Sequence, residues 1–129
     1  MKVVDAGVVI QLLVSDLSAE VLGDEPLAAP HLIDSEVTNV LRRLVFQNVL
    51  SEEQAAEALD GFARLTLNRF PAAFLRRRMW DHRHNLSAYD ATYVALAEAL
   101  AEALGATSLL TTDAKVAAAP GVACDIELV

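Results

Sequence analysis

Four acidic residues stand out in this sequence because of where they fall along the chain: Asp5, Glu36, Asp90 and Asp113. Asp5 and Asp113 follow the short apolar stretches "KVV" and "SLLT", which have the character of buried strands. Glu36 and Asp90 lie near the starts of helical patterns. In a parallel sheet, the carboxyl ends of strands and the N-termini of the following helices share one edge, so the four side chains are expected to converge on one cleft.

Converging carboxylates repel one another, and burial adds to the cost of keeping them charged. A divalent cation offsets both effects, and a site with oxygen ligands alone suits Mg²⁺ or, as its substitute, Mn²⁺. Such a cation lowers the pKa of a bound water and neutralises phosphate charge, which is the chemistry of phosphodiester hydrolysis. We predict that Asp5, Asp90 and Asp113 bind the metal directly. Glu36 is expected to be a further ligand or a base that orients the water.

Each of these carboxylates also has a purely structural interpretation. Ser87 and Asp90 form an S-x-x-D capping box. Asp5 and Asp113 can each cap the helix that follows, and Glu36 can favour the positive end of its helix. On this interpretation the chain is a non-catalytic α/β binding module. A phospho-receiver domain is a third hypothesis, but it requires adjacent acids after the first strand, where "VVDAGVV" offers one.

Strand and helix patterns alternate along the chain. Strands are expected at 2–4, 27–29, 65–70, 107–111 and 124–129, and helices at 6–14, 31–48, 52–65, 72–84, 85–104 and 113–119. Ser51 and Gln54 have capping-box spacing, and Gly105 suits a helix C-cap. This alternation predicts one domain over 1–129, a three-layer α/β/α sandwich with a short, mostly parallel central sheet.

The composition is that of a globular chain with one core. Of the 129 residues, 54% are hydrophobic, yet no apolar run reaches the ~18–20 residues of a membrane span. The N-terminus, "MKVVDAGVVIQLLV", makes a poor signal peptide and a good first strand and helix. Cys124 is the single cysteine, so no internal disulfide forms, and we expect a buried, inert thiol. A cytoplasmic location without membrane attachment fits these features.

Four segments carry a family resemblance: "VVDAGVVIQLL", "APHLIDSEVTNVLRRLV", "YDATYVALAEALA" and "LLTTDAKVA". In order and spacing they resemble the successive motifs of PIN-domain ribonucleases, and most closely those of VapC-type toxins of type II toxin–antitoxin systems. The resemblance extends from Val3 to about Ala119.

The family's acidic positions fall on the four carboxylates already singled out, with Thr111 as an accompanying hydroxyl. Gly7 stands where the family often has Ser or Thr, so one possible hydroxyl near the metal is absent. Asp34 and Asp125 are spare acids to which we assign no role.

The resemblance implies a Mg²⁺-dependent endoribonuclease that acts as the toxin of a toxin–antitoxin pair. Its implied partners are an RNA substrate, a cognate VapB-type antitoxin and a second copy of the chain in a homodimer. In that family the antitoxin often places an arginine in the acidic cleft. Apolar positions expected to be exposed in 32–65, which are Val45, Phe46, Val49 and Leu50, suit the dimer contact or the antitoxin groove.

The net charge of −8 argues against a general polyanion-binding surface. Part of that charge is expected in the metal site, where a bound cation inverts the local field. Eight of the ten basic residues are arginines, and six of these cluster at 42–43, 76–78 and 83. Arg83 and Arg43 are possible RNA contacts, with Arg83 at the cleft rim. A solvated helix face is the structural alternative for these arginines.

Aromatic and histidine side chains near Asp90 have open roles. Tyr89 and Tyr93 lie four residues apart on one helix face, where packing on a neighbouring helix is favoured over stacking on a base. Trp80 is expected in the core or an interface. His82 and His84 are expected at the surface, without a metal role.

Overall fold

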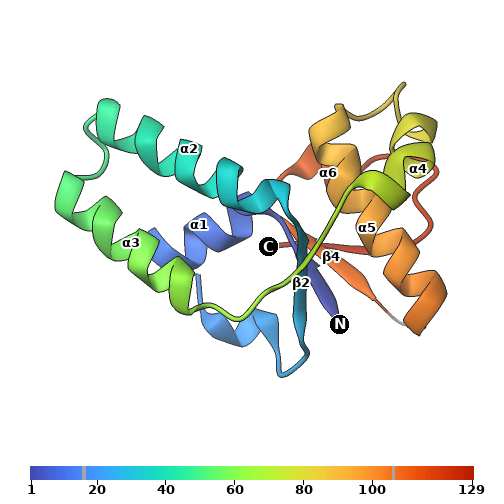
Figure 1. Cartoon of the computed structure of the whole chain (residues 1–129), viewed down its shortest axis with the longest axis horizontal. Coiled ribbons are helices and arrows are strands. Elements are labelled where there is room, and N and C mark those ends of the chain that lie inside the picture. Colours follow the sequence, from blue (N-terminus) through green and yellow to red (C-terminus); the bar gives the residue numbers. More distant parts are fainter. Residues whose placement is uncertain (16, 106) are drawn as a thin grey trace.

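A parallel sheet lies at the centre of the chain, which the computed structural model describes over residues 1–15, 17–105 and 107–129 (Figure 1). Its strands are β1 (Lys2–Val4), β2 (Leu27–Pro30), β3 (Asn68–Phe70), β4 (Ser108–Thr111) and β5 (Asp125–Leu128). They are ordered β3-β2-β1-β4-β5, and every neighbouring pair is parallel. The carboxyl ends of all these strands therefore meet at one edge of the sheet.

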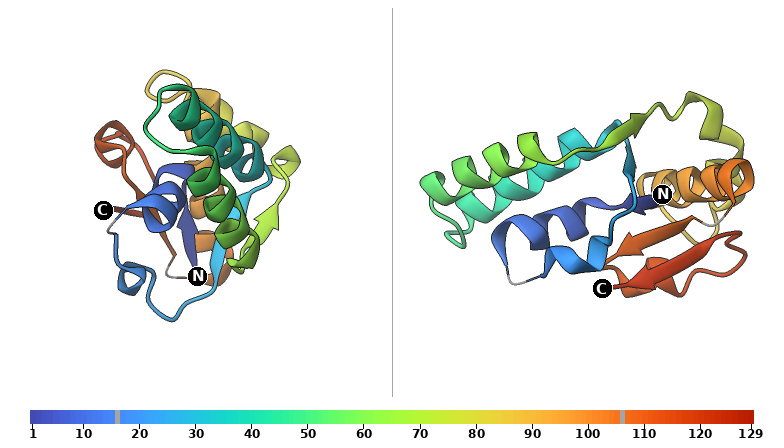
Figure 2. Two further views of the ribbon diagram at one scale, coloured as in Figure 1. Left: turned by 90° about the vertical axis from the view of Figure 1, so that its left-hand side faces the viewer. Right: turned by 90° about the horizontal axis from the view of Figure 1, so that it is seen from below.

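Helices cover both faces of this sheet, which confirms the predicted α/β/α sandwich. They are α1 (Ala6–Val14), α2 (Leu32–Phe46), α3 (Glu52–Arg64), α4 (Arg76–Asp81), α5 (Ala88–Leu104) and α6 (Ala114–Ala117), with short 3₁₀ helices η1 (Ala19–Leu22) and η2 (Ala73–Leu75). Helices α1, α2 and α3 pack together, whereas α5 packs on β1, β2 and β4 and contacts α4. Figures 1 and 2 show α2 and α3 as a pair that extends away from the sheet.

Local sequence signals explain most helix ends. The Ser51–Gln54 capping box forms with both bonds, from Gln54 N–H to Ser51 Oγ (3.0 Å) and from Ser51 N–H to Gln54 Oε1 (2.9 Å). Gly105 ends α5 with a φ of 89°, a conformation that strains any residue with a Cβ. Ser87 accepts a bond from Asp90 N–H (3.1 Å) and so begins α5.

The helix predicted over 72–84 is wrong in its extent, because the chain turns after Asp81. This turn carries His82 inward, where its Nε2 lies 2.9 Å from Glu98 Oε1 on α5. The other oxygen of Glu98 accepts a bond from Ala123 N–H (2.8 Å). His82 is therefore buried, contrary to its predicted surface position, whereas His84 is exposed as expected. The hydrogen bond between the buried His82 and Glu98 side chains stabilises this turn more than further helical turns would.

Three more expectations need correction or refinement. Trp80 is 62% exposed and does not belong to the core. Tyr89 is 67% exposed, whereas Tyr93 is buried, so the pair does not pack on a neighbouring helix as expected. The buried stretch of α5 begins at Ala91, and Tyr89 comes before it. Cys124 is half-buried, and its burial raises the pKa of the thiol to about 11, as suits an unreactive cysteine.

Helix α5 is the best-buried helix of the fold. Every residue from Ala91 to Glu98 is buried, and five of these eight positions hold alanine, valine or leucine. Its alanine side chains are small, which lets the helix approach the sheet closely. Leu96 is the largest aliphatic side chain of this stretch and is fully buried. In the described ranges, no helix is both long enough and apolar enough to cross a membrane.

We expect Leu96→Ala to lower the free energy of unfolding by about 2–5 kcal/mol, because it leaves a cavity beneath α5. Leu104→Ala is the matched control on the same helix, since Leu104 is 61% exposed, and its cost should stay within about 0.5 kcal/mol. Urea unfolding followed by circular dichroism measures both values. Equal losses in the two variants would contradict this account of the core.

Candidate functional site

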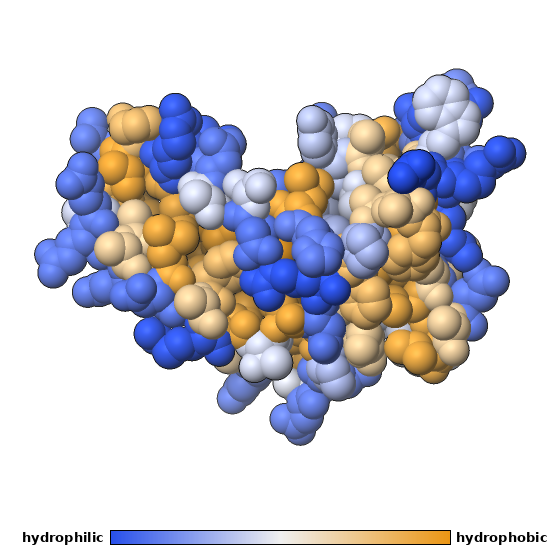
Figure 3. Space-filling model, in the orientation of Figure 1, coloured by the Kyte–Doolittle hydropathy of each residue, from blue (hydrophilic) through white to orange (hydrophobic). Residues whose placement is uncertain are grey.

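All four predicted carboxylates line one cavity of about 200 Å³ at the carboxyl edge of the sheet. Asp5 follows β1 and Asp113 follows β4, while Glu36 comes from α2 and Asp90 from the first turn of α5. The remaining lining consists of Ala6, Gly7, Tyr93, Leu109, Thr112 and Val116. Figure 3 shows the molecular surface hollowed between the α2 side and the α5 side. The parallel strand arrangement thus brings these acids together as expected; we call this space the acidic cavity.

Thr111 connects the two strand ends that carry aspartates. Its buried hydroxyl donates to Asp5 Oδ2 and accepts a bond from Asp113 N–H (3.0 Å). Asp5 Oδ1 also accepts from Val8 N–H (2.9 Å), and Asp113 Oδ1 accepts from Lys115 N–H (2.8 Å). Both aspartates therefore do cap helices, but capping also fixes their carboxylates at the cavity.

Three carboxyl groups of the cavity have raised pKa values. Burial is the main cause of the raised pKa of Asp5, Glu36 and Asp90. Neighbouring negative charges add to it, chiefly Asp113 on Asp90, and Asp90 on both Asp5 and Glu36. The hydrogen bond from Thr111 opposes the shift at Asp5. Keeping these three carboxyl groups ionised therefore costs free energy, and a bound cation would lower that cost.

Two buried oxygens at this cavity, Glu36 Oε1 and the Tyr93 hydroxyl, form no hydrogen bond of good geometry within the described residues. The two side chains are nevertheless close neighbours, because a hydrogen bond from Tyr93 lowers the pKa of Glu36 against the raising effect of burial. Tyr93 is therefore the partner that the chain offers to Glu36 when no ion, water or substrate is bound. Burial, followed by the charge of Glu36, raises the pKa of Tyr93, which keeps its hydroxyl protonated. Our sequence reasoning missed Tyr93 as a lining residue. Its spacing of three residues from Asp90 was the available signal.

The donor set fits a divalent cation. Carboxylate and hydroxyl oxygens are the ligands that Mg²⁺ and Mn²⁺ prefer, and the side chains that line the cavity offer both kinds. Nevertheless, across 1–15, 17–105 and 107–129, no three acids or other ligating side chains already stand at the spacing of one metal site. Coordination of one ion by three carboxylates therefore requires side-chain rotation toward the ion.

Thr112 occupies the space that a side chain at position 7 would need. A Cβ built on Gly7 would overlap Thr112 Oγ1 and lie 3.4 Å from Asp5 Oδ1. A hydroxyl is thus present where a side chain at position 7 would lie, but it comes from the loop after β4 and not from α1. Sequence reasoning missed Thr112, for which the doublet "TTD" before Asp113 was the only sign.

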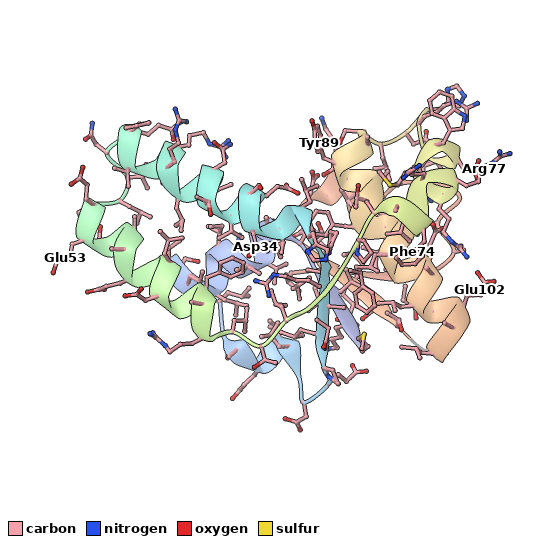
Figure 4. All side chains as sticks on the ribbon, viewed as in Figure 1. Asp34, Glu53, Phe74, Arg77, Tyr89 and Glu102 are labelled. Atoms are coloured by element: carbon pink, nitrogen blue, oxygen red, sulfur yellow. The ribbon has the colours of Figure 1, made fainter. Side chains whose placement is uncertain are left out.

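The remaining candidate residues lie outside the acidic cavity. Arg43 is exposed on α2, and Arg83 is exposed beyond α4, with its guanidinium carbon 4.6 Å from the centroid of the Trp80 ring. Asp34 forms a two-bond ion pair with Arg69, at 2.7 and 2.8 Å, which lowers the pKa of Asp34 (Figure 4). Asp125 is exposed on β5. The two spare acids thus have no place among the lining side chains.

Comparison with known proteins identifies close relatives, although no family model matches the chain. The chain is 44% identical to Ribonuclease VapC1 of Mycobacterium tuberculosis over 133 residues, covering 98% of this chain and 96% of the relative. It is 43% identical to Ribonuclease VapC9 of the same organism over 121 residues, covering 93% and 95%. The crystal structure of PAE2754 from Pyrobaculum aerophilum has a similar fold, with a TM-score of 0.66 at 21% identity over 97% of this chain and 82% of that one.

We expect Gly7→Ala to lower the free energy of unfolding by about 1–3 kcal/mol, because the new methyl group displaces the Thr112 hydroxyl. In an open helix the same change would stabilise by about 0.5–1 kcal/mol. The double variant Gly7→Ala/Thr112→Ala removes the overlapping oxygen and should be at least as stable as Thr112→Ala alone. Urea unfolding of all three variants measures the coupling, and strictly additive effects would contradict the overlap.

We also expect Asp90→Asn to raise the free energy of unfolding at pH 7 in EDTA. The raised pKa of Asp90 means that its charged form destabilises the native state above that pKa. The gain should therefore shrink as the pH falls through the raised pKa and vanish below the ordinary value of 3.8, where both the folded and the unfolded carboxyl are protonated. Asp34→Asn is a control of opposite sign, because its pKa is lowered. Thermal unfolding from pH 4 to 8 tests both, and the same sign in both variants would refute the prediction.

Proposed function

Because this chain belongs to the VapC family of PIN-domain ribonucleases, we propose that it is a Mg²⁺-dependent endoribonuclease, the toxin of a toxin–antitoxin pair. The observation that carries this proposal is the acidic cavity itself. Four carboxylates from four parts of the fold line it, and three of them have a raised pKa.

In this mechanism Asp5, Asp90 and Asp113 hold the cation. When bound, Mg²⁺ would lower the pKa of a water and neutralise charge on the scissile phosphate. Glu36 orients the attacking water and accepts its proton, a role that its raised pKa suits because the group is then a stronger base. Thr111 fixes the orientation of Asp5 through its hydrogen bond.

The capping-only alternative explains part of the geometry. Asp5 and Asp113 cap α1 and α6. Ser87 caps α5, but in the described part of the chain the Asp90 carboxylate returns no bond to Ser87 N–H, so this capping box is half-formed. A hydrogen bond with the Ser87 side chain still lowers the pKa of Asp90 against the larger effect of burial. Capping therefore accounts for part of the placement of Asp90 and gives no reason for Glu36 to face the cavity. The nuclease proposal accounts for all four side chains.

We further propose a VapB-type antitoxin as partner, with a cytoplasmic location. An apolar groove of about 320 Å³ between α2 and α3 suits an apolar segment of such a partner, and its lining includes Leu41, Val45, Phe46 and Leu59. An arginine of the antitoxin would be attracted to the acidic cavity, where it would compete with the metal. A homodimer is part of the same proposal.

The test is RNA cleavage by the purified protein with Mg²⁺. We expect EDTA to abolish cleavage. Asp5→Ala, Asp90→Ala and Asp113→Ala should each lower the rate at least about 100-fold, since a lost ligand removes several kcal/mol of transition-state stabilisation. Asp34→Ala is the matched control, because Asp34 pairs with Arg69 outside the cavity, and it should cleave at the parent rate. Full activity in the three cavity variants would rule out the site assignment.

Calorimetric titration with Mn²⁺ separates the nuclease from the capping-only module. The nuclease proposal expects saturable binding that Asp90→Ala weakens and Asp34→Ala leaves unchanged. A protein whose carboxylates only cap helices would show no specific heat of binding.

A further inference from the structure

The structure sorts the arginines of the run 76–78 by their partners. Arg77 Nε lies 3.6 Å from Asp81 Oδ1, and Arg78 forms an ion pair with Glu102 on α5. Figure 4 shows Arg77 pointing outward from α4. Within the described ranges, neither Arg76 nor Arg83 has a carboxylate within salt-bridge distance. Their positive charges are thus not neutralised by the chain itself.

These two arginines line a second cavity, which we call the Trp80 pocket. It has a volume of about 460 Å³, within the ~300–1,000 Å³ typical of ligand pockets. Its lining consists of Arg76, Met79, Trp80, Arg83, Leu86, Ser87 and Ala88, without any carboxylate. In a chain with a net charge of −8, a pocket with two arginines and no acid attracts an anionic ligand.

Trp80 and Arg83 form a fixed stack in this pocket. The Arg83 guanidinium carbon lies 4.6 Å from the ring centroid, and Arg83 Nη1 donates to the carbonyl oxygen of Trp80 (3.0 Å). Even so, the indole stays 62% exposed. A large exposed aromatic ring beside a held cation is the arrangement on which nucleobases stack while a phosphate meets the arginine.

The Trp80 pocket and the acidic cavity share one helix end. Ser87 and Ala88, which line the pocket, are the N-cap and first residue of α5, and Asp90 of the same turn lines the acidic cavity. Both spaces therefore take lining residues from the first turn of α5, which places them at the same end of this helix.

We propose that the Trp80 pocket binds a base of single-stranded RNA by stacking on Trp80, with a flanking phosphate held by Arg76 and Arg83. This inference rests on the proposed function, because it assigns a subsite to the same RNA. Unstacked bases of single strands are available for such contacts, and stacking tolerates any base. The subsite thus supplies affinity and register and leaves the chemistry to the carboxylates.

Trp80 is the single tryptophan of the chain, so its fluorescence reports on this pocket alone. The experiment titrates the full chain in EDTA with an uncleaved oligoribonucleotide of about eight nucleotides. We expect saturable quenching of Trp80 fluorescence. The anisotropy of a labelled copy of the same RNA gives the dissociation constant independently.

Variants then test the pocket. Trp80→Leu and Arg83→Gln should each weaken RNA binding about tenfold, the loss of one stacked base or one held phosphate. Arg83→Gln should also reduce the salt dependence, by about 0.7 in the slope of log K against log salt. Arg77→Gln and Phe74→Leu are matched controls, an arginine paired with Asp81 and an exposed aromatic outside the pocket lining, and should bind as the parent does.

Several outcomes would overturn the subsite. One is that RNA binding saturates without any quenching of Trp80 fluorescence. Another is that both pocket variants bind RNA with the affinity of the parent. A third is a Trp80→Leu variant that binds RNA with unchanged affinity but has a changed oligomeric state by light scattering. That result would show that the pocket forms a contact between copies of the chain.

The two proposals fail separately. Cleavage in Mg²⁺ without quenching would refute the subsite alone, whereas quenching without any cleavage would refute the nuclease and leave the subsite standing.

Discussion

Repulsion among carboxylates gathered at one sheet edge is the constraint on which the rest of this structure depends. Asp5, Glu36, Asp90 and Asp113 line one small cavity, where partial burial and neighbouring negative charge disfavour the ionised forms of the first three. Such an arrangement persists only if the scaffold enforces it. Here the parallel strands fix two of the acids, and a helix buried against the sheet fixes a third. Much of the core's stability thus serves to keep like charges together.

The sequence predicted the features that local rules determine. Asp5, Ser51 and Gly105 each end or begin a helix through a short-range effect, and strand–helix alternation implies the parallel sheet that gathers the acids. It failed where distant residues decide the outcome. His82 turns inward because Glu98 on another helix is buried and needs a partner, and neither residue has a local sign of this pairing.

The same limit applies inside the candidate site. Placing Asp90 on a helix start needed only helical spacing, whereas the role of Thr112 depends on how closely the loop after β4 approaches Gly7. A family comparison at position 7 alone suggests a missing hydroxyl. The structure shows that the hydroxyl of Thr112 occupies this space from another element, so the residue type at position 7 does not by itself decide which side-chain atoms stand there.

The hydrogen bond of Thr111 with Asp5 joins residues that are 106 positions apart. Strand β1 is synthesised well before its partner β4, with β2, β3 and five α-helices between them along the chain. A nascent chain that ends before β4 has neither Thr111 nor Asp113, and its Asp5 lacks the bond that orients it. The acidic cavity therefore comes into existence only after β4 has been synthesised, which delays anything its carboxylates can do until every strand and helix that lines the cavity has been made.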